Sequence, residues 1–236
     1  MTRKVAVIGA GIVGVCCAGW LQRKGFSVTL IDRDGPGEGT SFGNAGSLSP
    51  TAVLPVAMPG MLKQIPGWLL DPLGPLTIRW SYLPRAAPWL WRFLRCANEA
   101  QMWRTANGMR GLLTPMFECY EPLIRNAHAE NLIRREGCLY VYDSEETFRA
   151  GKPMQDLRRK LGAVLEDLTE SDIKRLEPAL SHKFRWGVYA PANGLTVNPH
   201  RLSKTLAEQV VADGGRLLRA EISNVEVRGD GTKIIR

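Results

Sequence analysis

Three glycines near the start of the chain have the spacing of a phosphate-binding loop. Residues 9–14 read GAGIVG, and Asp32 stands at the end of the next apolar run. In a GxGxxG pattern the first glycine permits a tight turn, the second lets backbone approach a diphosphate, and the third lets a helix pack on a strand. Amides at the helix start would hold the phosphates, and the Asp32 carboxylate would accept hydrogen bonds from a ribose hydroxyl. The predicted contacts are Gly9, Ala10, Gly11, Ile12, Val13, Gly14 and Asp32.

The neighbouring elements supply the context that this motif requires. Residues 4–8 are a short apolar run typical of a buried parallel strand, and residues 12–24 have helical periodicity that Gly25 ends. Residues 26–31 form a second apolar run. Together they predict a strand, helix, strand unit with a right-handed crossover. The charge of Asp32 disfavours a 2′-phosphate, but the unit alone does not separate FAD from NAD.

The segment after Asp32 favours FAD. Residues 33–50 read RDGPGEGTSFGNAGSLSP and resemble the flavoenzyme superfamily that includes D-amino-acid dehydrogenases, glycine and sarcosine oxidases and D-amino-acid oxidase. In that superfamily a loop ending in Thr-Ser and Asn-Ala-Gly follows the ribose acid. The resemblance implies further FAD contacts from Arg33, Thr40, Ser41, Asn44, Ala45 and Gly46. Small residues let backbone approach a flat ring, while hydroxyl and amide groups bind its polar edges. The alternative is a glycine- and serine-rich surface loop.

The resemblance extends along the chain and is closest to the D-amino-acid dehydrogenase branch. It includes LSPTAVLPVAMPGMLKQIPGWL, LTESDIKRLEPAL and GLTVNPHRLSKTLAEQVVADGG. It implies an α/β fold in which a Rossmann-like FAD-binding domain, residues 1–55 and 197–236, contains an inserted α+β substrate domain, residues 56–196. By its position Ile222 would lie near the adenine. The family's next flavin-binding strand and its substrate-binding segments are expected beyond Arg236, which implies a C-terminally incomplete domain.

Local signals predict the remaining elements. Eight of the 15 prolines lie in residues 50–88, which argues against long helices and central strands there. Residues 89–131 predict one or two long helices with a break at Thr114 and Pro115. Further predictions are strands at 139–142, 184–190 and 216–227, two helices within 153–177, a helix from Asn198 to Asp213, and a turn at 229–231 leading into a last strand.

Composition limits the class of protein. The chain has 31 basic and 23 acidic residues, a net charge of +8, without a nucleic-acid-binding signature. Five cysteines without a CxxC pair favour a reducing, cytoplasmic location, and no apolar run approaches the roughly 20 residues that cross a bilayer. Cys16 and Cys17 are assigned to the core. The three histidines are isolated in the sequence, so we predict no hydrolytic triad, and we name no catalytic residue or metal ligand.

Tryptophans and arginines alternate between positions 68 and 104. They are Trp68, Trp80, Trp89, Trp91 and Trp103, with Arg85, Arg92, Arg95 and Arg104. One interpretation is packing of these aromatics against the flavin domain or a partner subunit, which we favour because large aromatics usually fill cores and interfaces. The other is a peripheral contact with the cytoplasmic face of an anionic membrane, from which a quinone could accept electrons.

The function implied by the resemblance is oxidation of a D-amino acid or related amine. Hydride would pass from the carbon that bears nitrogen to the flavin, giving an imine that hydrolyses to a keto acid and ammonia. Three alternatives stay open: an oxygen-using oxidase of glycine, sarcosine or a cyclic imino acid; a non-catalytic nucleotide-binding fragment; and an NAD-dependent dehydrogenase, which residues 40–46 disfavour.

Overall fold

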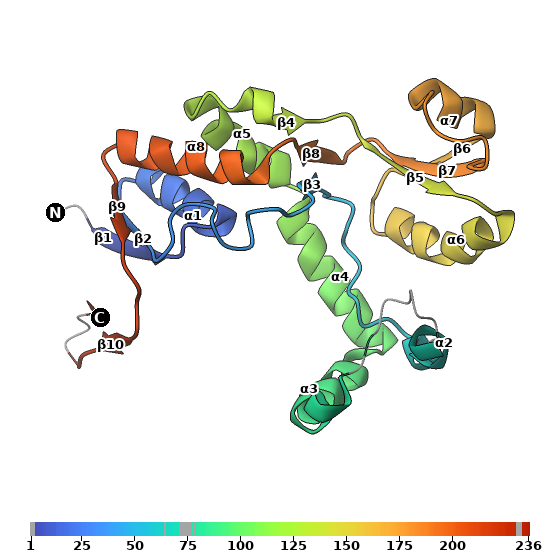
Figure 1. Ribbon diagram of the computed structural model, residues 1–236, viewed down its shortest axis with the longest axis horizontal. Coiled ribbons are helices and arrows are strands. Elements are labelled where there is room, and N and C mark those ends of the chain that lie inside the picture. Colours follow the sequence, from blue (N-terminus) through green and yellow to red (C-terminus); the bar gives the residue numbers. More distant parts are fainter. Residues whose placement is uncertain (1–2, 64, 71–76, 78, 230–232) are drawn as a thin grey trace. The chain divides into compact units, whose positions relative to one another are not determined.

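The computed structural model describes residues 3–63, 65–70, 77, 79–229 and 233–236 (Figure 1). They form two compact units, one of residues 1–49, 116–138 and 191–236 and the other of residues 50–115 and 139–190. The predicted division into an FAD-binding domain, residues 1–55 and 197–236, and a substrate domain, residues 56–196, stays a prediction. The compact units are drawn differently, because residues 116–138 pack in the same unit as the glycine motif.

The first unit contains a parallel sheet in the order β1-β2-β9. Strand β1 (Lys4–Ile8) leads through helix α1 (Ile12–Arg23) to β2 (Ser27–Asp32), and β2 pairs with β9 (Arg216–Arg219). The predicted strand, helix, strand unit is therefore confirmed, with bounds that differ by one residue. Because parallel strands align their carboxyl ends, the loops after β1, β2 and β9 all leave the same edge of the sheet.

Two helices share a core with α1. Helix α8 (Pro199–Ala212) begins as predicted at Asn198, whose side chain accepts a hydrogen bond from the Arg201 amide at 2.9 Å. Its apolar face is buried, as predicted, through Leu202, Leu206 and Val210. Helix α5 (Met116–Asn126) adds Leu123 and Ile124 to the same cluster. This burial is the physical reason that α5 belongs to the first unit.

A small antiparallel sheet in the first unit has the order β3-β8-β4. Strand β3 (Ser47–Leu48) and strand β4 (Ile133–Arg134), which follows a 3-10 turn (Glu130–Leu132), both pair with β8 (Gly194–Thr196). The last strands, β10 (Val225–Val227) and β11 (Lys233–Ile235), pair with each other. Most of the predicted turn at 229–231 lies outside the described residues. The sheet β3-β8-β4 fixes the end of the loop that follows Asp32.

The second unit contains the sheet β5-β7-β6. Its strands are β5 (Cys138–Tyr142), β7 (Trp186–Ala190) and β6 (Glu166–Leu168), with helices α6 (Glu145–Lys160) and α7 (Glu170–Leu176). Thr169 caps α7, as predicted, and forms a capping box in which its own amide donates to Asp172. The sequence correctly predicted both helices, although α6 begins at Glu145, earlier than expected.

Helices in the proline-rich part of the second unit require a correction. The 3-10 turns Met61–Lys63 and Trp80–Tyr82 and the short α2 (Ile65–Leu70) fit the expectation for residues 50–88, but α3 (Leu83–Cys96) does not. Pro84 lies in its first turn, where no amide partner is needed, and Pro88 removes one further bond. One or two helices were predicted for residues 89–131. This range contains most of α3, all of α4 (Glu99–Leu113) and all of α5, so three helices are present there. The break at Thr114 and Pro115 is confirmed.

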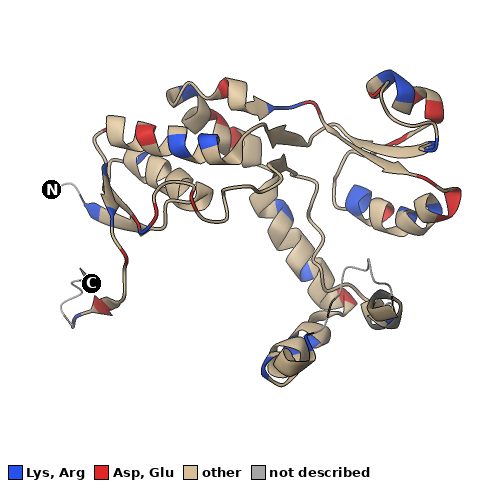
Figure 2. Cartoon of the chain, viewed as in Figure 1, with Lys and Arg blue, Asp and Glu red and all other residues tan. Residues whose placement is uncertain are grey.

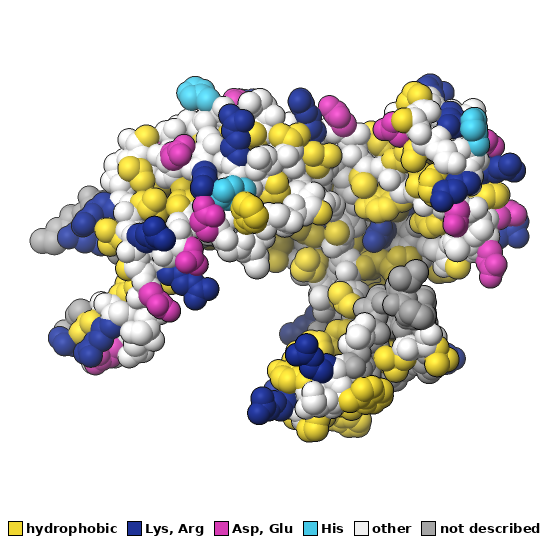
Figure 3. All heavy atoms as spheres, viewed as in Figure 1, with side chains coloured by type: hydrophobic (Ala, Val, Ile, Leu, Met, Phe, Trp, Pro, Cys, Tyr) yellow, Lys and Arg dark blue, Asp and Glu magenta, His cyan; other side chains and the backbone are white. Residues whose placement is uncertain are grey.

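Helix α3 differs from its neighbours in composition. Its ribbon carries basic residues and no acidic ones (Figure 2), and apolar and basic side chains lie together on its visible surface (Figure 3). None of its residues is fully buried. No helix in the described part of the chain combines the length and the apolar character needed to cross a membrane.

Candidate functional site

The glycine motif forms a tight connection between β1 and α1. Gly9 has a φ of +98°, which favours glycine, and its amide donates to the carbonyl of Ile31 at 2.7 Å. A Cβ built on Gly14 would lie 1.9 Å from the Gly9 carbonyl oxygen, so only glycine fits there. The motif therefore brings the first turn of α1 against the end of β1, as the sequence predicted.

The carboxylate of Asp32 points toward the start of α1. Its Oδ2 accepts from the Ala10 amide at 2.7 Å, and its Oδ1 accepts from the amides of Asp34 and Gly35, both at 2.9 Å. Partial burial acts to raise the pKa of Asp32, but these three bonds and the neighbouring Arg33 outweigh it and leave the pKa below its ordinary value. The group is thus an ionised acceptor at the mouth of the helix.

Ser41 lies at the same place. Its side chain is buried, and its hydroxyl oxygen accepts from the Ile12 amide at 3.0 Å. A Cβ built on Gly11 would lie 3.4 Å from this oxygen, in ordinary contact. Because the hydroxyl accepts from the helix, its own proton is available to a further acceptor. An oxyanion at the helix start is the group that would satisfy it.

The rest of the loop turns toward strand β3. Asn44 Oδ1 accepts from the Gly46 amide at 2.8 Å, and the carbonyl of buried Gly46 accepts from the Thr196 amide at 2.8 Å. Thr40 and Ala45 are exposed. Arg33 is also exposed and pairs with Asp34 at 3.0 Å, while its carbonyl accepts from Arg219 Nε at 3.2 Å. Among the predicted loop residues, Ser41 therefore bonds to the start of α1, and Asn44 and Gly46 line a hollow together with Ile12 of α1. No hydrogen bond or ion pair with α1 is found for Arg33, Thr40 or Ala45 in the part of the chain that the structure describes.

Ile222 follows strand β9, which ends beside Asp32. The Ala220 amide donates to the carbonyl of Asp32 at 2.9 Å, and Ile222 is half-buried two residues further on. The structure thus brings Ile222 to the carboxyl edge of the sheet, where the glycine loop and Asp32 also lie.

A cluster that sequence reasoning missed fastens the loop to α8. Glu38 Oε1 accepts from Lys204 Nζ at 2.8 Å and lies 3.2 Å from His200 Nε2. The ring of His200 also meets Phe42 edge to face at 4.9 Å. Donation by Lys204, and then by His200, lowers the pKa of Glu38. His200 is a helix-start residue, as predicted, but it has an acidic partner that the sequence did not reveal.

Replacing Glu38 with glutamine is expected to loosen this fastening. Amides of residues 33–46 should exchange hydrogen roughly two- to fivefold faster, the range of an exposed ion pair. Hydrogen exchange measured by mass spectrometry checks this. Glu208→Gln, on the exposed side of α8, removes the same charge and should leave the loop unchanged. Equal exchange in the two variants would contradict a fastening role.

A hollow of about 140 Å³ lies beside the loop. Asn44, Gly46 and Ser47 line one part of it, and Tyr120 and Thr196 line another. The hydroxyl of Thr196 is buried and has no hydrogen-bond partner among the described residues. Other atoms of Thr196 line the hollow, whereas this hydroxyl oxygen is closed off from solvent.

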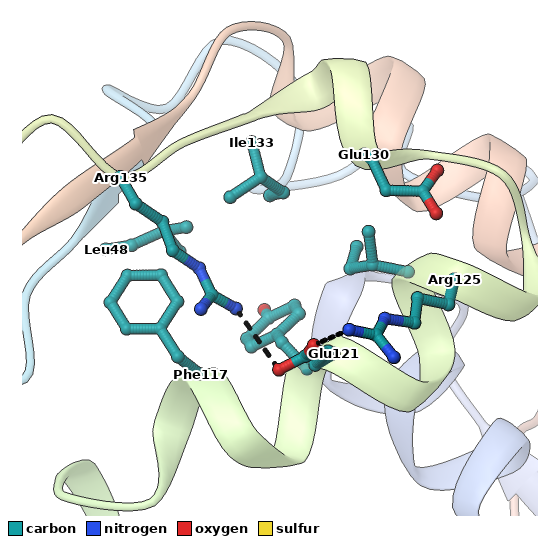
Figure 4. Close-up of a pocket in the computed structure, with 9 residues that line it drawn as sticks. Leu48, Phe117, Glu121, Arg125, Glu130, Ile133 and Arg135 are labelled. Carbon is teal, nitrogen blue, oxygen red and sulfur yellow. Dashed lines mark hydrogen bonds and ion pairs between the residues drawn. The ribbon is translucent and has the colours of Figure 1, made fainter.

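A second hollow, of about 320 Å³, lies between α5 and strands β3 and β4 (Figure 4). Phe117 and Leu48 line its apolar part. Glu121 lies between Arg125, with which it forms an ion pair, and Arg135, whose guanidinium is 3.9 Å away (Figure 4). Glu130 adds a second acid, so the charges of the lining balance and give no strong preference for an anion.

The cysteines near the motif are not arranged for chemistry. Burial raises the pKa of Cys16 to about 12, more than offsetting its hydrogen bond with Tyr120, so the thiol stays protonated. Burial also raises the pKa of Tyr120. Cys16 is half-buried against the α1 core, as predicted, but Cys17 is exposed, so its assignment to the core was wrong. It lies on the outer side of α1, one position from the packed face.

Comparison with known proteins gives consistent results. Residues 4–236 match the profile of a family described as FAD dependent oxidoreductase. A D-amino-acid oxidase of Bradyrhizobium diazoefficiens is 38% identical over 231 residues, 97% of this chain and 55% of the relative. D-amino acid dehydrogenase 2 of Ralstonia nicotianae is 35% identical over 182 residues, 75% of this chain and 42% of the relative. The chain thus spans about half the length of these curated relatives.

Solved structures share the fold. Glycine oxidase from Geobacillus kaustophilus superposes with a TM-score of 0.62 at 17% identity, covering 99% of this chain and 51% of that one. At this identity the likeness concerns the fold alone. It agrees with the α/β architecture predicted from the sequence.

Proposed function

The chain belongs to the FAD-dependent oxidoreductase family, and from this premise we propose that its glycine loop, Asp32 and the following loop bind FAD. The observation that carries the proposal is the Asp32 carboxylate, which lies 2.7 Å from the Ala10 amide at the start of α1. The residues proposed to contact FAD are Gly9, Ala10, Gly11, Ile12, Val13, Gly14, Asp32, Arg33, Thr40, Ser41, Asn44, Ala45, Gly46 and Ile222.

The start of α1 fits a diphosphate. Amides in the first turn of a helix have no partner within the helix, and the helix dipole adds positive potential there. Gly11 presents no side chain to the space beside Ser41, so phosphate oxygens could reach the amides of the turn. The Ser41 hydroxyl, which already accepts from Ile12, would donate its proton to a phosphate oxygen.

The edge of the parallel sheet fits an adenosine. One oxygen of Asp32 would accept from a ribose hydroxyl, since a carboxylate offers about four acceptor positions and three are occupied. Ile222, after β9, would contact the adenine through backbone. In the direction of β3, Asn44, which lines the hollow beside the loop, would meet polar atoms of the flavin.

The proposed reaction is oxidation of a D-amino acid or related amine, in keeping with the names of the two curated relatives. When bound, the flavin supplies a hydride acceptor, so the carbon bearing the amine would give an imine that hydrolyses to a keto acid and ammonia. The residues described above would hold the cofactor. We assign no catalytic residue to this chain.

The electron acceptor separates two versions of this function. Oxygen would make the enzyme an oxidase and yield peroxide, whereas a membrane quinone would make it a dehydrogenase and require a peripheral membrane contact. The basic and aromatic surface of α3 favours the second version.

Titration with FAD tests the proposal. The purified chain should take up about one FAD, seen as quenching of flavin fluorescence and as absorbance at about 450 nm. Addition of D-amino acids without oxygen should bleach that absorbance faster than addition of the L-enantiomers. NAD should not compete. If FAD is not taken up, or if NAD displaces it, the cofactor proposal fails; binding without bleaching would instead identify a nucleotide-binding chain without activity.

A further inference from the structure

Helix α3 and the 3-10 turn before it expose an unusual set of aromatic side chains. Trp80 is 72% exposed, Trp89 62% and Trp91 65%, with Tyr82 beside them at 56%. Among the residues that the structure describes, Trp89 stacks only on Phe93 of the same helix, with ring centroids 5.1 Å apart. Large aromatics normally lie in cores and interfaces. Trp103, by contrast, packs in the core of the second unit. Packing of the exposed aromatics against the flavin domain or a partner subunit, which we favoured from the sequence, stays a prediction.

The charges around these aromatics have a single sign. Residues 72–98 contain four arginines and no aspartate or glutamate. Arg79, Arg85, Arg92 and Arg95 are all exposed, and none forms an ion pair among the described residues. Figure 2 shows the basic residues on α3 without an acidic neighbour on that helix, and Figure 3 shows them among apolar side chains.

Helix α3 has a half-buried face and an exposed face. Its half-buried positions, Leu83, Ala86, Leu90, Phe93 and Leu94, recur at the three- and four-residue spacing of one helical face. The remaining arc carries Trp89 and Trp91 together with Arg85, Arg92 and Arg95. It is this outer arc, with Trp80 and Tyr82, that we call the α3 surface.

We propose that the α3 surface docks on an anionic phospholipid membrane. Indole rings prefer the headgroup level of a bilayer, where one side is apolar and the other is wet. Guanidinium groups bind phosphates with paired N–H donors. Each basic residue near an anionic leaflet contributes roughly a fivefold gain in membrane partition. Three arginines on one arc thus correspond to about 100-fold.

Charge and surface chemistry argue against two other occupants of the α3 surface, a second copy of this chain and a nucleic acid. A symmetric dimer through the α3 surface would place its arginines against those of the second copy, and like charges in an interface oppose association. A nucleic-acid duplex would satisfy the arginines but would leave the exposed tryptophans beside its phosphate backbone, because its bases are already stacked inside the helix. The biological role of this docking, to bring a flavoprotein to an electron acceptor in the membrane, rests on the proposed function. The docking itself rests only on the side chains of the α3 surface.

Vesicle flotation of the whole chain tests this without flavin or substrate. At low salt the chain should float with vesicles that contain phosphatidylglycerol and should stay in solution with pure phosphatidylcholine. The variant R85Q/R92Q/R95Q should lose about 100-fold in partition. Trp89→Ser with Trp91→Ser should weaken binding at every salt concentration, because it removes the apolar part.

A matched control separates this surface from overall charge. R149Q/R175Q/R185Q removes the same three charges from exposed arginines elsewhere in the second unit, and it should float like the unaltered chain. Circular dichroism verifies that each variant is folded. Equal losses in the two triple variants, or no flotation of the unaltered chain, would overturn the inference. So would concentration-dependent dimerisation that the α3 variants abolish, which would assign the surface to a second copy.

Discussion

Replacing Gly14 with alanine is expected to lower the melting temperature by roughly 6 to 12 °C, from about 3 kcal/mol of lost stability. The added Cβ would lie 1.9 Å from the Gly9 carbonyl oxygen and 3.6 Å from Val7 Cγ1. The closer of these atoms belongs to the backbone and cannot rotate away. The helix must therefore move off the strand, which changes the position of the amides at its start.

The same change should weaken FAD binding by roughly 100-fold, or about 2.7 kcal/mol, which is the equivalent of one strong charge-assisted hydrogen bond. Thermal unfolding followed by circular dichroism and a fluorescence titration with FAD measure the two effects. Gly108→Ala, in the interior of α4, is the matched control because no atom lies within 4 Å of its added Cβ. It should stabilise the chain by about 0.5 to 1 kcal/mol. A Gly14→Ala chain that melts and binds like the unaltered one would refute the close approach.

Elements whose signals are local could be predicted from the sequence. The unit β1, α1, β2 and the start of α8 at Asn198 each depend on periodicity and on a capping or turn residue within the segment itself. The position of Asp32 at the end of β2 followed from the same pattern. These features hold in the structure because the local preference and the packing agree.

Contacts between distant segments could not be predicted. Glu38 and His200 are 162 residues apart, and nothing near either residue in the sequence indicates the other. The membership of α5 in the first unit depends on Leu123 and Ile124 reaching the core of α1 and α8. The orphaned hydroxyl of Thr196 is likewise visible only once β8 pairs with β3.

Helix α3 shows how a sound general rule can mislead. Prolines at positions 84 and 88 argued against a helix, yet one falls in the first turn and the other removes a single bond. The tryptophans favoured packing against the flavin domain or a partner subunit, which stays a prediction. Their exposure depends on which face of the helix meets the rest of the unit, and periodicity alone does not determine this when both faces are partly apolar.

Replacing Asp32 with alanine is the second large change, and we expect it to weaken FAD binding by roughly 10- to 150-fold, since one charge-assisted hydrogen bond to a ribose hydroxyl, worth about 1.5 to 3 kcal/mol, would be lost. The amides of Ala10, Asp34 and Gly35 would lose their acceptor as well. Losing three hydrogen bonds to a carboxylate would cost more in a dry interior. Because Asp32 and the amides that it binds are partly open to water, water replaces part of what is lost, and we expect the free energy of unfolding to fall by about 2 to 4 kcal/mol. Asp34→Ala, which removes an exposed carboxylate next to the site, should have little effect on either quantity.

The pH dependence gives a signature that a merely disruptive substitution would lack. The pKa of Asp32 is lower in the folded chain than in the unfolded one, so the stability it contributes is fully present above the unfolded value of about 4 and is lost as pH falls toward the folded value. Unfolding measured from pH 7 down to pH 3 should show a decline below about pH 4. That decline should be smaller in Asp32→Ala and intact in Asp34→Ala. If Asp32→Ala kept the full acid decline, the three amide bonds would not be what holds this carboxylate ionised, and its proposed place on the ribose would lose its physical basis.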